Sequence, residues 1–177
     1  VCFGTHDVAV GDFTSDNIAD LIVACWGGSV VSFLRGIGNG TFAAAVNITV
    51  GAAPVSVIAA DFNGDGRLDA AVANNSGASV SVLIGHGDGT FDTHVPYAVG
   101  NGPHSVRTGD LNADGRLDLA VANDSSSSIS VLYGLGNGTF AGAVSYPTGS
   151  VPKGVAIGDI NGDGQPDLLS ANTAGNY

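Results

Sequence analysis

The chain of 177 residues contains no glutamate and no methionine. All sixteen acidic residues are aspartate, although glutamate is the better helix former and aspartate the better turn and loop residue. A protein whose acidity served only solubility or a helix surface would use both. The absence of glutamate therefore indicates that the carboxylates belong to turns and loops.

Positive charge is also scarce, and the net charge is −11. Nucleic-acid and anionic-membrane surfaces need clustered lysine and arginine, so we expect neither partner. No stretch approaches the roughly 18 apolar residues of a membrane-spanning helix, so no membrane span is expected. The N-terminus lacks a charged region followed by an apolar run, which predicts either a mature, processed chain or a fragment. The only cations are Arg35, Arg67, Arg107, Arg116 and Lys153.

The two cysteines, Cys2 and Cys25, leave the redox compartment open. A chain of this length does not need a disulfide to fold, which argues against a bridge. Both cysteines lie in the first repeat, where later repeats carry Gly or Asn, which argues for one. The sequence does not decide between a disulfide and two free thiols.

An aspartate-rich loop recurs every 49 residues, as DFTSDNIAD, DFNGDGRLD, DLNADGRLD and DINGDGQPD, beginning at Asp12, Asp61, Asp110 and Asp159. Each loop has carboxylates at positions 1, 5 and 9, and three of the four have Asn at position 3. Such oxygen-rich spacing suits a hard divalent cation, and a plain turn needs one Asx residue, not three carboxylates. Twelve of the sixteen aspartates lie in these loops, so four divalent ions would change the net charge from −11 to −3.

The repeat predicts an all-β fold. Residues 61–91 match residues 110–140 at 21 of 31 positions without a gap, and a 40- to 50-residue period is typical of propeller blades. Four β-rich runs divided by turn signals, 55–61, 69–74, 79–85 and 90–99, predict a four-stranded antiparallel meander in each blade. We expect one repeat domain over 1–177, with repeats at about 5–50, 54–99, 103–148 and an incomplete 152–177, or about 3.5 blades. A closed propeller usually needs 4 to 8 blades, so further blades or another chain should complete it.

The motifs resemble those of FG-GAP/VCBS repeats, the units of integrin-α-like β-propellers. The resemblance is carried by the DxNxDGxxDL loop, the following AVAN, the GxGxGTF turn and a Gly-x-x-Pro element at Gly51, Gly100 and Gly149. It implies blades and calcium over essentially the whole chain. Proteins with similar repeats include adhesion receptors, fungal lectins and large secreted or surface proteins of bacteria, so the biological role stays open.

Each loop is expected to hold one Ca²⁺, up to four in all, through the side chains at positions 1, 3, 5 and 9 and the backbone carbonyl of position 7. Mg²⁺ is less suitable because it prefers small octahedral shells that retain water. The first loop departs from the pattern, since it has Thr at position 3 and Asn17 in place of the position-6 Gly, and we expect it to bind most weakly. The predicted ligands are Asp12, Thr14, Asp16, Ile18 and Asp20; Asp61, Asn63, Asp65, Arg67 and Asp69; Asp110, Asn112, Asp114, Arg116 and Asp118; and Asp159, Asn161, Asp163, Gln165 and Asp167.

A few residues outside the loops are candidates for other roles. His6 and His104 occupy equivalent positions before an inner strand and would line one mouth of a propeller, although solvated loop histidines are commoner than ligands. Trp26 replaces Asn75 and Asp124 of the later repeats and would either stack on a sugar ring or serve as a packing or partner contact. Five Asn-x-Ser/Thr sequons also occur, at Asn39, Asn47, Asn74, Asn123 and Asn137.

The function that this pattern favours is an extracellular or cell-surface, calcium-binding, non-catalytic module for adhesion, carbohydrate or protein recognition, or surface assembly. One alternative is a substrate-positioning part of a secreted polysaccharide-acting enzyme. The four aspartates outside the loops show no convincing pairing for glycoside hydrolysis, so no catalytic residue is expected. A second alternative is a self-assembling structural subunit. The four remaining aspartates are Asp7, Asp88, Asp92 and Asp124.

Overall fold

The computed structural model describes residues 2–174; residue 1 of the predicted 1–177 domain and residues 175–177 of its predicted last repeat lie outside the described part. The described chain forms four antiparallel sheets of four, four, four and two strands, each following the order of the sequence. This confirms the predicted all-β fold of four-stranded meanders with about 3.5 blades. No helix in residues 2–174 is long and apolar enough to cross a membrane.

The strands have these bounds. Blade 1 contains β1 (Thr5–Gly11), β2 (Asp20–Cys25), β3 (Val30–Leu34) and β4 (Val46–Thr49). Blade 2 contains β5 (Pro54–Ala60), β6 (Asp69–Asn74), β7 (Ser79–Leu83) and β8 (Val95–Ala98), with a short 3₁₀ turn η1 (Asn75–Gly77) between β6 and β7. Blade 3 contains β9 (Pro103–Gly109), β10 (Asp118–Asn123), β11 (Ser128–Leu132) and β12 (Val144–Pro147). The half-blade contains β13 (Pro152–Gly158) and β14 (Asp167–Asn172).

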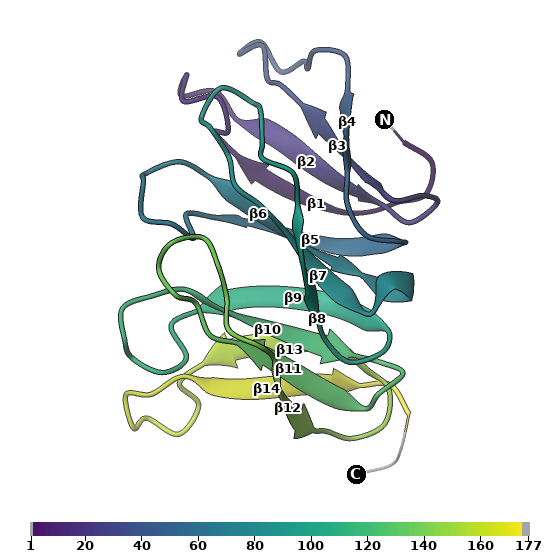
Figure 1. Ribbon diagram of the computed structural model, residues 1–177, viewed down its shortest axis with the longest axis vertical. Coiled ribbons are helices and arrows are strands. Elements are labelled where there is room, and N and C mark those ends of the chain that lie inside the picture. The colour runs from purple at the N-terminus through teal and green to yellow at the C-terminus, as the bar shows by residue number, and fades with distance from the viewer. Residues whose placement is uncertain (1, 175–177) are drawn as a thin grey trace.

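The blades stack face to face along the long axis of the molecule, from blade 1 in purple to the half-blade in yellow (Figure 1). The first strands β1, β5, β9 and β13 lie next to one another in that order. The four aspartate loops, each joining the first strand of a blade to the second, lie along one side of the stack, at the left in Figure 1. The turns between second and third strands lie on the opposite side, so the stack has two chemically different rims.

Burial of the second strands follows from their place in the stack. Every residue of β6 and β10 is buried because a blade covers each face of the sheet. The equivalent β2 alternates between buried and partly exposed residues, and β14 is nowhere fully buried, because each has one uncovered face. The apolar runs LDAAVAN and LDLAVAN thus encode strands sandwiched between neighbours.

Three hydrophobic clusters fill the spaces between consecutive blades. Phe13, Ile22 and Phe33 of blade 1 pack with Val72 and Leu83 of blade 2. The other two clusters repeat this arrangement between blades 2 and 3 and between blade 3 and the half-blade. Each interface therefore depends on both of the blades that form it.

The fourth strand is shorter than the sequence predicts. The run 90–99 was expected to be extended throughout, but β8 covers only Val95–Ala98. The preceding GHGDGTF segment forms a compact turn closed by an isolated bridge between Gly85 and Phe91 and by a hydrogen bond from the N–H of His86 to the carbonyl of Thr90. Gly87 at φ +71° and Gly89 at φ +83° confirm the turn that the sequence predicts in this segment, and the difference from the prediction lies in residues 90–94, before β8 begins.

Candidate metal centre: the aspartate loops

The carboxylate at position 1 organises each loop from within. In the second loop Asp61 Oδ1 accepts the N–H groups of Gly64 at 2.7 Å and Asp65 at 3.2 Å, and Oδ2 accepts the N–H of Gly66 at 2.8 Å. Gly66, at position 6, has φ +81°, the left-handed conformation that turns its N–H back toward Asp61. The Asp61 side chain therefore fixes the path of the loop around itself.

Positions 3 and 5 form a polar pair on the exposed side of the loop. Asn63 Oδ1 accepts the N–H of Asp65 at 3.0 Å, and Asn63 Nδ2 donates to Asp65 Oδ2 at 3.2 Å. The other oxygen of Asp65 accepts the N–H of Arg67 at 2.9 Å, and the Arg67 guanidinium lies 3.9 Å from Asp65 Oδ2. Rotation of the Asn63 amide toward an ion would break its hydrogen bond with the Asp65 N–H but leave the bonds of Gly64 and Gly66 to Asp61 in place.

Position 9 is the buried member of the set. Asp69 is fully buried, and its two oxygens accept the N–H groups of Phe62 and Gly85, each at 2.8 Å. Burial raises the pKa of Asp69 above its ordinary value, and the neighbouring carboxylates of Asp61 and Asp65 raise it further, while the two N–H groups act in the opposite direction. The three carboxylates therefore repel one another, which a bound cation would relieve.

The third loop repeats this geometry, and the fourth does so except that Asp167, its position-9 aspartate, is only partly buried. In the third, Asp110 Oδ2 accepts the N–H of Gly115 at 2.8 Å, and burial together with Asp114 and Asp110 raises the pKa of Asp118. In the fourth, Asp159 Oδ2 accepts the N–H of Gly164 at 2.9 Å. That N–H group is the main cause of a lowered pKa for Asp159.

The first loop differs at three points. Ser15 and Asn17 adopt φ +55° and +61°, where the second loop has glycines. The Thr14 hydroxyl donates to Asp20 Oδ2 at 3.2 Å and also interacts with the Asp16 side chain, but unlike Asn63 it offers no amide to the position-5 carboxylate. Asp16 Oδ2 accepts from the Arg35 guanidinium at 3.0 Å, and this hydrogen bond lowers the pKa of Asp16.

The donor set of loops two to four fits a hard cation. Each brings three carboxylates and an amide oxygen into one nine-residue turn, with the carbonyl of position 7 following in the chain, which is the ligand chemistry that Ca²⁺ prefers. Within the described residues, however, no three His, Cys, Asp or Glu side chains converge as metal ligands do. The predicted ligands therefore lie within the same short loop, but their oxygens are directed to hydrogen bonds within the loop and do not converge on one point.

The loops also belong to the contacts between blades. The N–H of Gly89, in the turn of blade 2, donates to the carbonyl of Phe13 in the first loop at 3.0 Å. The N–H of Gly138, in the turn of blade 3, donates likewise to Phe62 in the second loop at 3.1 Å. Ordering a loop therefore also orders the surface on which the next blade packs.

Sequence reasoning missed the structural role of position 9. Asp20, Asp69 and Asp118 each accept the N–H of a glycine sixteen residues later, at the start of the GxGxGTF turn. A constant spacing between the aspartate and that glycine is the signal that would have revealed it. These glycines are Gly36, Gly85 and Gly134.

The cysteines form a disulfide between Cys2 and Cys25, with Cα atoms 5.9 Å apart. Cys2 and Cys25 occupy the positions at which the later blades have a glycine and an asparagine in contact. In blade 2, Gly51 lies so close to Asn74 that a Cβ on Gly51 would meet Asn74 Cγ at 2.5 Å. Gly100 and Asn123 form the same contact. The disulfide of blade 1 thus occupies the place of a Gly–Asn contact.

The histidine pair lies on the first strands. His6 and His104 are two blades apart, yet their rings meet edge to face with centroids 5.6 Å apart. Nδ1 of each lies near the carbonyl of the equivalent residue of the next blade, Val55 at 2.8 Å and Lys153 at 3.2 Å. The structure thus brings together two of the predicted mouth residues.

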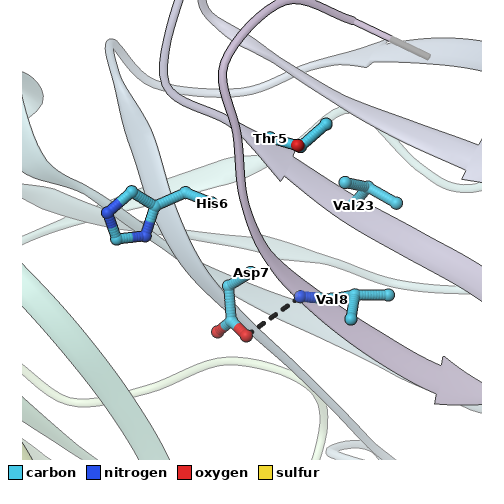
Figure 2. A pocket seen from close by; sticks show the side chains of 5 residues that line it. All are labelled: Thr5, His6, Asp7, Val8 and Val23. Atoms are coloured by element: carbon cyan, nitrogen blue, oxygen red, sulfur yellow. Dashed lines mark hydrogen bonds between the residues drawn. The ribbon is translucent and has the colours of Figure 1, made fainter.

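Blade 1 and the half-blade each expose an apolar sheet face. A hollow of about 330 Å³ on blade 1 is lined by Thr5, His6, Asp7, Val8 and Val23 (Figure 2). Val8 is 49% exposed there, whereas its equivalents Val57 and Val106 are buried under a neighbouring blade. A similar hollow of about 310 Å³ lies on β13 and β14, beside Leu169.

Comparison with known proteins agrees with this architecture. The model of the FG-GAP-like repeat matches residues 12–72, 61–121 and 110–170. No curated protein matches the chain.

Solved structures provide three similar folds. An Agrocybe aegerita lectin, described as recognising non-reducing terminal N-acetylglucosamine, has a TM-score of 0.59 and 23% identity over 91% of this chain and 45% of its own. The V. cholerae biofilm matrix protein Bap1 gives 0.57 and 19% over 95% and 28%. The Photorhabdus luminescens Tc holotoxin pore gives 0.53 and 18% over 91% and 8%. This chain spans less than half of each of these proteins. On the match of the repeat model across residues 12–170, the chain belongs to the FG-GAP-like repeat family.

Proposed function

We propose that this chain is a calcium-rigidified, non-catalytic recognition module that works outside the cell. The observation that carries the proposal is the construction of the aspartate loops, in which three carboxylates share one short turn next to the following blade. Ca²⁺ in loops two, three and four would supply the positive charge that these carboxylates lack. The ion would act structurally, by fixing the path of each loop and, in loop two, by holding it against the turn of blade 3, where Gly138 donates to Phe62.

The extracellular setting is supported by the disulfide. Bridges such as Cys2–Cys25 persist in oxidising compartments and are rare in the cytosol. Extracellular calcium sites are typically of modest affinity, about 10⁻⁴ to 10⁻³ M, which suits exposed loops of this kind. The two features favour the same compartment.

The non-catalytic assignment is supported by the aspartates outside the loops, each of which has a structural partner. Asp7 Oδ2 accepts from the Ser56 hydroxyl at 3.0 Å and the Val57 N–H at 3.1 Å. Asp92 lies 3.2 Å from the imidazole of His86. Asp88 caps Thr90, and Asp124 accepts from Ser125 at 2.7 Å. None is left as one of two facing carboxylates of the kind that glycoside hydrolysis uses.

Carbohydrate is the ligand class we propose for the recognition surface. Trp26, directly after β2, is 55% exposed, its backbone N–H donates to the carbonyl of Gly4, and an exposed indole face of this kind can stack on a sugar ring. The likeness in fold to a lectin that recognises N-acetylglucosamine is consistent with this class.

A glycan array tests the recognition role, with an activity screen on the same polysaccharides alongside it. The proposal predicts that the chain binds a glycan without cleaving it. Trp26→Ala should lose this binding. The control Ile37→Ala, which alters an exposed aliphatic residue on the aspartate-loop rim, should keep it. Turnover by the wild-type chain would instead favour the secreted-enzyme alternative.

Self-association is a second candidate function, favoured by the two open sheet faces. The face of each first strand packs on the preceding blade inside the stack, so the uncovered β1–β2 face suits the uncovered β13–β14 face of a second copy, head to tail. The solution mass, measured by light scattering over a range of concentrations, tests this: a mass above one chain supports the association.

A further inference from the structure

Blade 1 and blade 2 have an isoleucine and an arginine at the same two structural positions, but in opposite order. At position 7 of the loop, blade 1 has Ile18 and blade 2 has Arg67. At the residue after the third strand, blade 1 has Arg35 and blade 2 has Ile84. The isoleucine and the arginine thus occur in both blades, in opposite places.

The exchange preserves packing but moves the positive charge. Ile18 lies over Gly36, whose added Cβ would meet Ile18 Cγ2 at 2.7 Å. Ile18 Cδ1 also lies 3.1 Å from a Cβ built on Gly38, and the stem of Arg67 lies likewise against Gly87, the equivalent glycine of blade 2. The guanidinium of blade 1 therefore approaches the loop from the end of β3, not from the loop itself.

From this direction the guanidinium makes a hydrogen bond that its counterparts do not make. Arg35 Nη2 lies 3.0 Å from Asp16 Oδ2, whereas the arginine–aspartate separations in loops two and three are 3.9 Å and 3.7 Å. Only the first distance lies within hydrogen-bond range for N–H to oxygen. The first loop is thus the one in which the position-5 carboxylate has a directly bonded cation.

The hydrogen-bond partner of the position-5 Oδ2 atom decides how readily an ion can enter the loop. In loops two, three and four the position-5 Oδ2 accepts from a neutral amide, that of Asn63, Asn112 or Asn161, at 3.2, 3.0 and 3.0 Å. Such an amide can rotate and offer its oxygen to the ion. In the first loop Ca²⁺ would have to displace a guanidinium or lie beside it. Thr14 offers no amide there, and its hydroxyl is shared between Asp20 and Asp16.

We propose that Arg35 is the built-in cation of the first loop, so that the chain takes up calcium in loops two, three and four but not in loop one. The proposal rests on the calcium function proposed above. It makes blade 1, which also carries the disulfide, independent of calcium, while the later blades depend on it.

Counting bound ions tests the proposal. Native mass spectrometry at saturating calcium should show three ions on the wild-type chain. Asp16→Asn should retain the wild-type number, and Asp65→Asn, the same change at the same position of loop two, should lose one. Loss of an ion in Asp16→Asn, or a fourth ion on the wild-type chain, would overturn the proposal. A wild-type chain that binds no ion would instead refute the calcium function itself.

Hydrogen exchange on the unmodified protein gives a second readout that does not depend on the folding of a variant. The N–H of Asn17 donates to Asp12 at 2.7 Å and that of Gly66 donates to Asp61 at 2.8 Å, so the two amides are equivalent. Calcium should slow the exchange of Gly66 several-fold and leave that of Asn17 unchanged. Equal slowing at both amides would show that the first loop also binds the ion.

Discussion

The N–H of Gly85 donates to the buried carboxylate of Asp69 at 2.8 Å, joining the aspartate loop of blade 2 to the turn that follows its third strand. The other oxygen of Asp69 accepts the N–H of Phe62 at 2.8 Å. The same carboxylate that completes the predicted metal ligand set therefore also connects three segments of the blade. Its role in stability should be separable from any role in ion binding.

Asp69→Asn should destabilise the protein even without calcium, because the amide nitrogen would face one of two N–H donors. Hydrogen bonds to charged groups contribute about 1.5–3 kcal/mol each, so a loss of about 2–4 kcal/mol is expected. Urea unfolding in EDTA measures it. Asp65→Asn, at the exposed position 5, is the control and should change the free energy of unfolding by less than about 1 kcal/mol. Equal losses in the two variants would contradict the structural role of Asp69.

Removal of the disulfide should destabilise blade 1, and the residues of the later blades should restore part of the loss. Cys2 and Cys25 are 23 residues apart, and closing a loop of this order stabilises a protein by about 3 kcal/mol in the chain-entropy model. The Cys2→Ala/Cys25→Ala variant should lose about that much. Cys2→Gly/Cys25→Asn should lose less, because it recreates the contact of Gly51 with Asn74. Chemical denaturation of both variants measures the difference; if the Gly/Asn variant is the less stable, the two contacts are not equivalent.

Two of the five sequons should remain unmodified in a secretory host. Asn74 and Asn123 are fully buried, and each donates its Nδ2 to two serine hydroxyls. Glycopeptide mass spectrometry should find both unglycosylated in folded protein. The exposed Asn39, whose Oδ1 accepts from Thr41, is the internal comparison. A glycan on either buried Asn would show that these strand ends open before or after folding.

Charge on the open face of blade 1 should prevent self-association without unfolding the chain. Val8→Asp introduces a carboxylate where the side chain is 49% exposed, so the blade should tolerate it. Val57→Asp, the equivalent change in β5, would bury the charge at a position that is 3% exposed and should unfold the protein. Light scattering should show a wild-type mass above one chain and a single chain for Val8→Asp. A wild-type chain that stays single at high concentration would contradict the head-to-tail contact.

Most of the fold follows from the sequence because the repeats within this one chain can be aligned with one another. The period of 49 residues, the turn signals and the apolar second strands together predict the meanders and the burial of β6 and β10. The predicted fourth strand is too long at its start, because residues 90–94 follow the GHGDGTF turn through an isolated Gly85–Phe91 bridge and pair as a regular strand only from Val95. Whether the cysteines pair was undecidable from sequence alone, because their positions in space were not known.

The loop residues were found from spacing alone, but their partners were not. Nothing local to the first loop predicts that Asp16 pairs with Arg35, nineteen residues later, because that contact needs the return of β3 alongside β2. Only the comparison of Ile18 and Arg35 with Arg67 and Ile84 points to it. Sequence patterns thus located the candidate site. Which cation lies against the carboxylates of each loop depends on contacts between segments that are distant in sequence.

Thermal unfolding with and without calcium measures whether the ion stabilises the folded chain. An ion that binds only the folded chain stabilises it by about 2.7 kcal/mol per site at a hundred times its dissociation constant. The melting temperature of the wild-type protein should therefore fall clearly when calcium is replaced by excess EDTA. Asp65→Asn/Asp114→Asn, which removes the position-5 ligands of two loops, should show a much smaller shift. A wild-type melting curve that is the same in calcium and in EDTA would contradict the account.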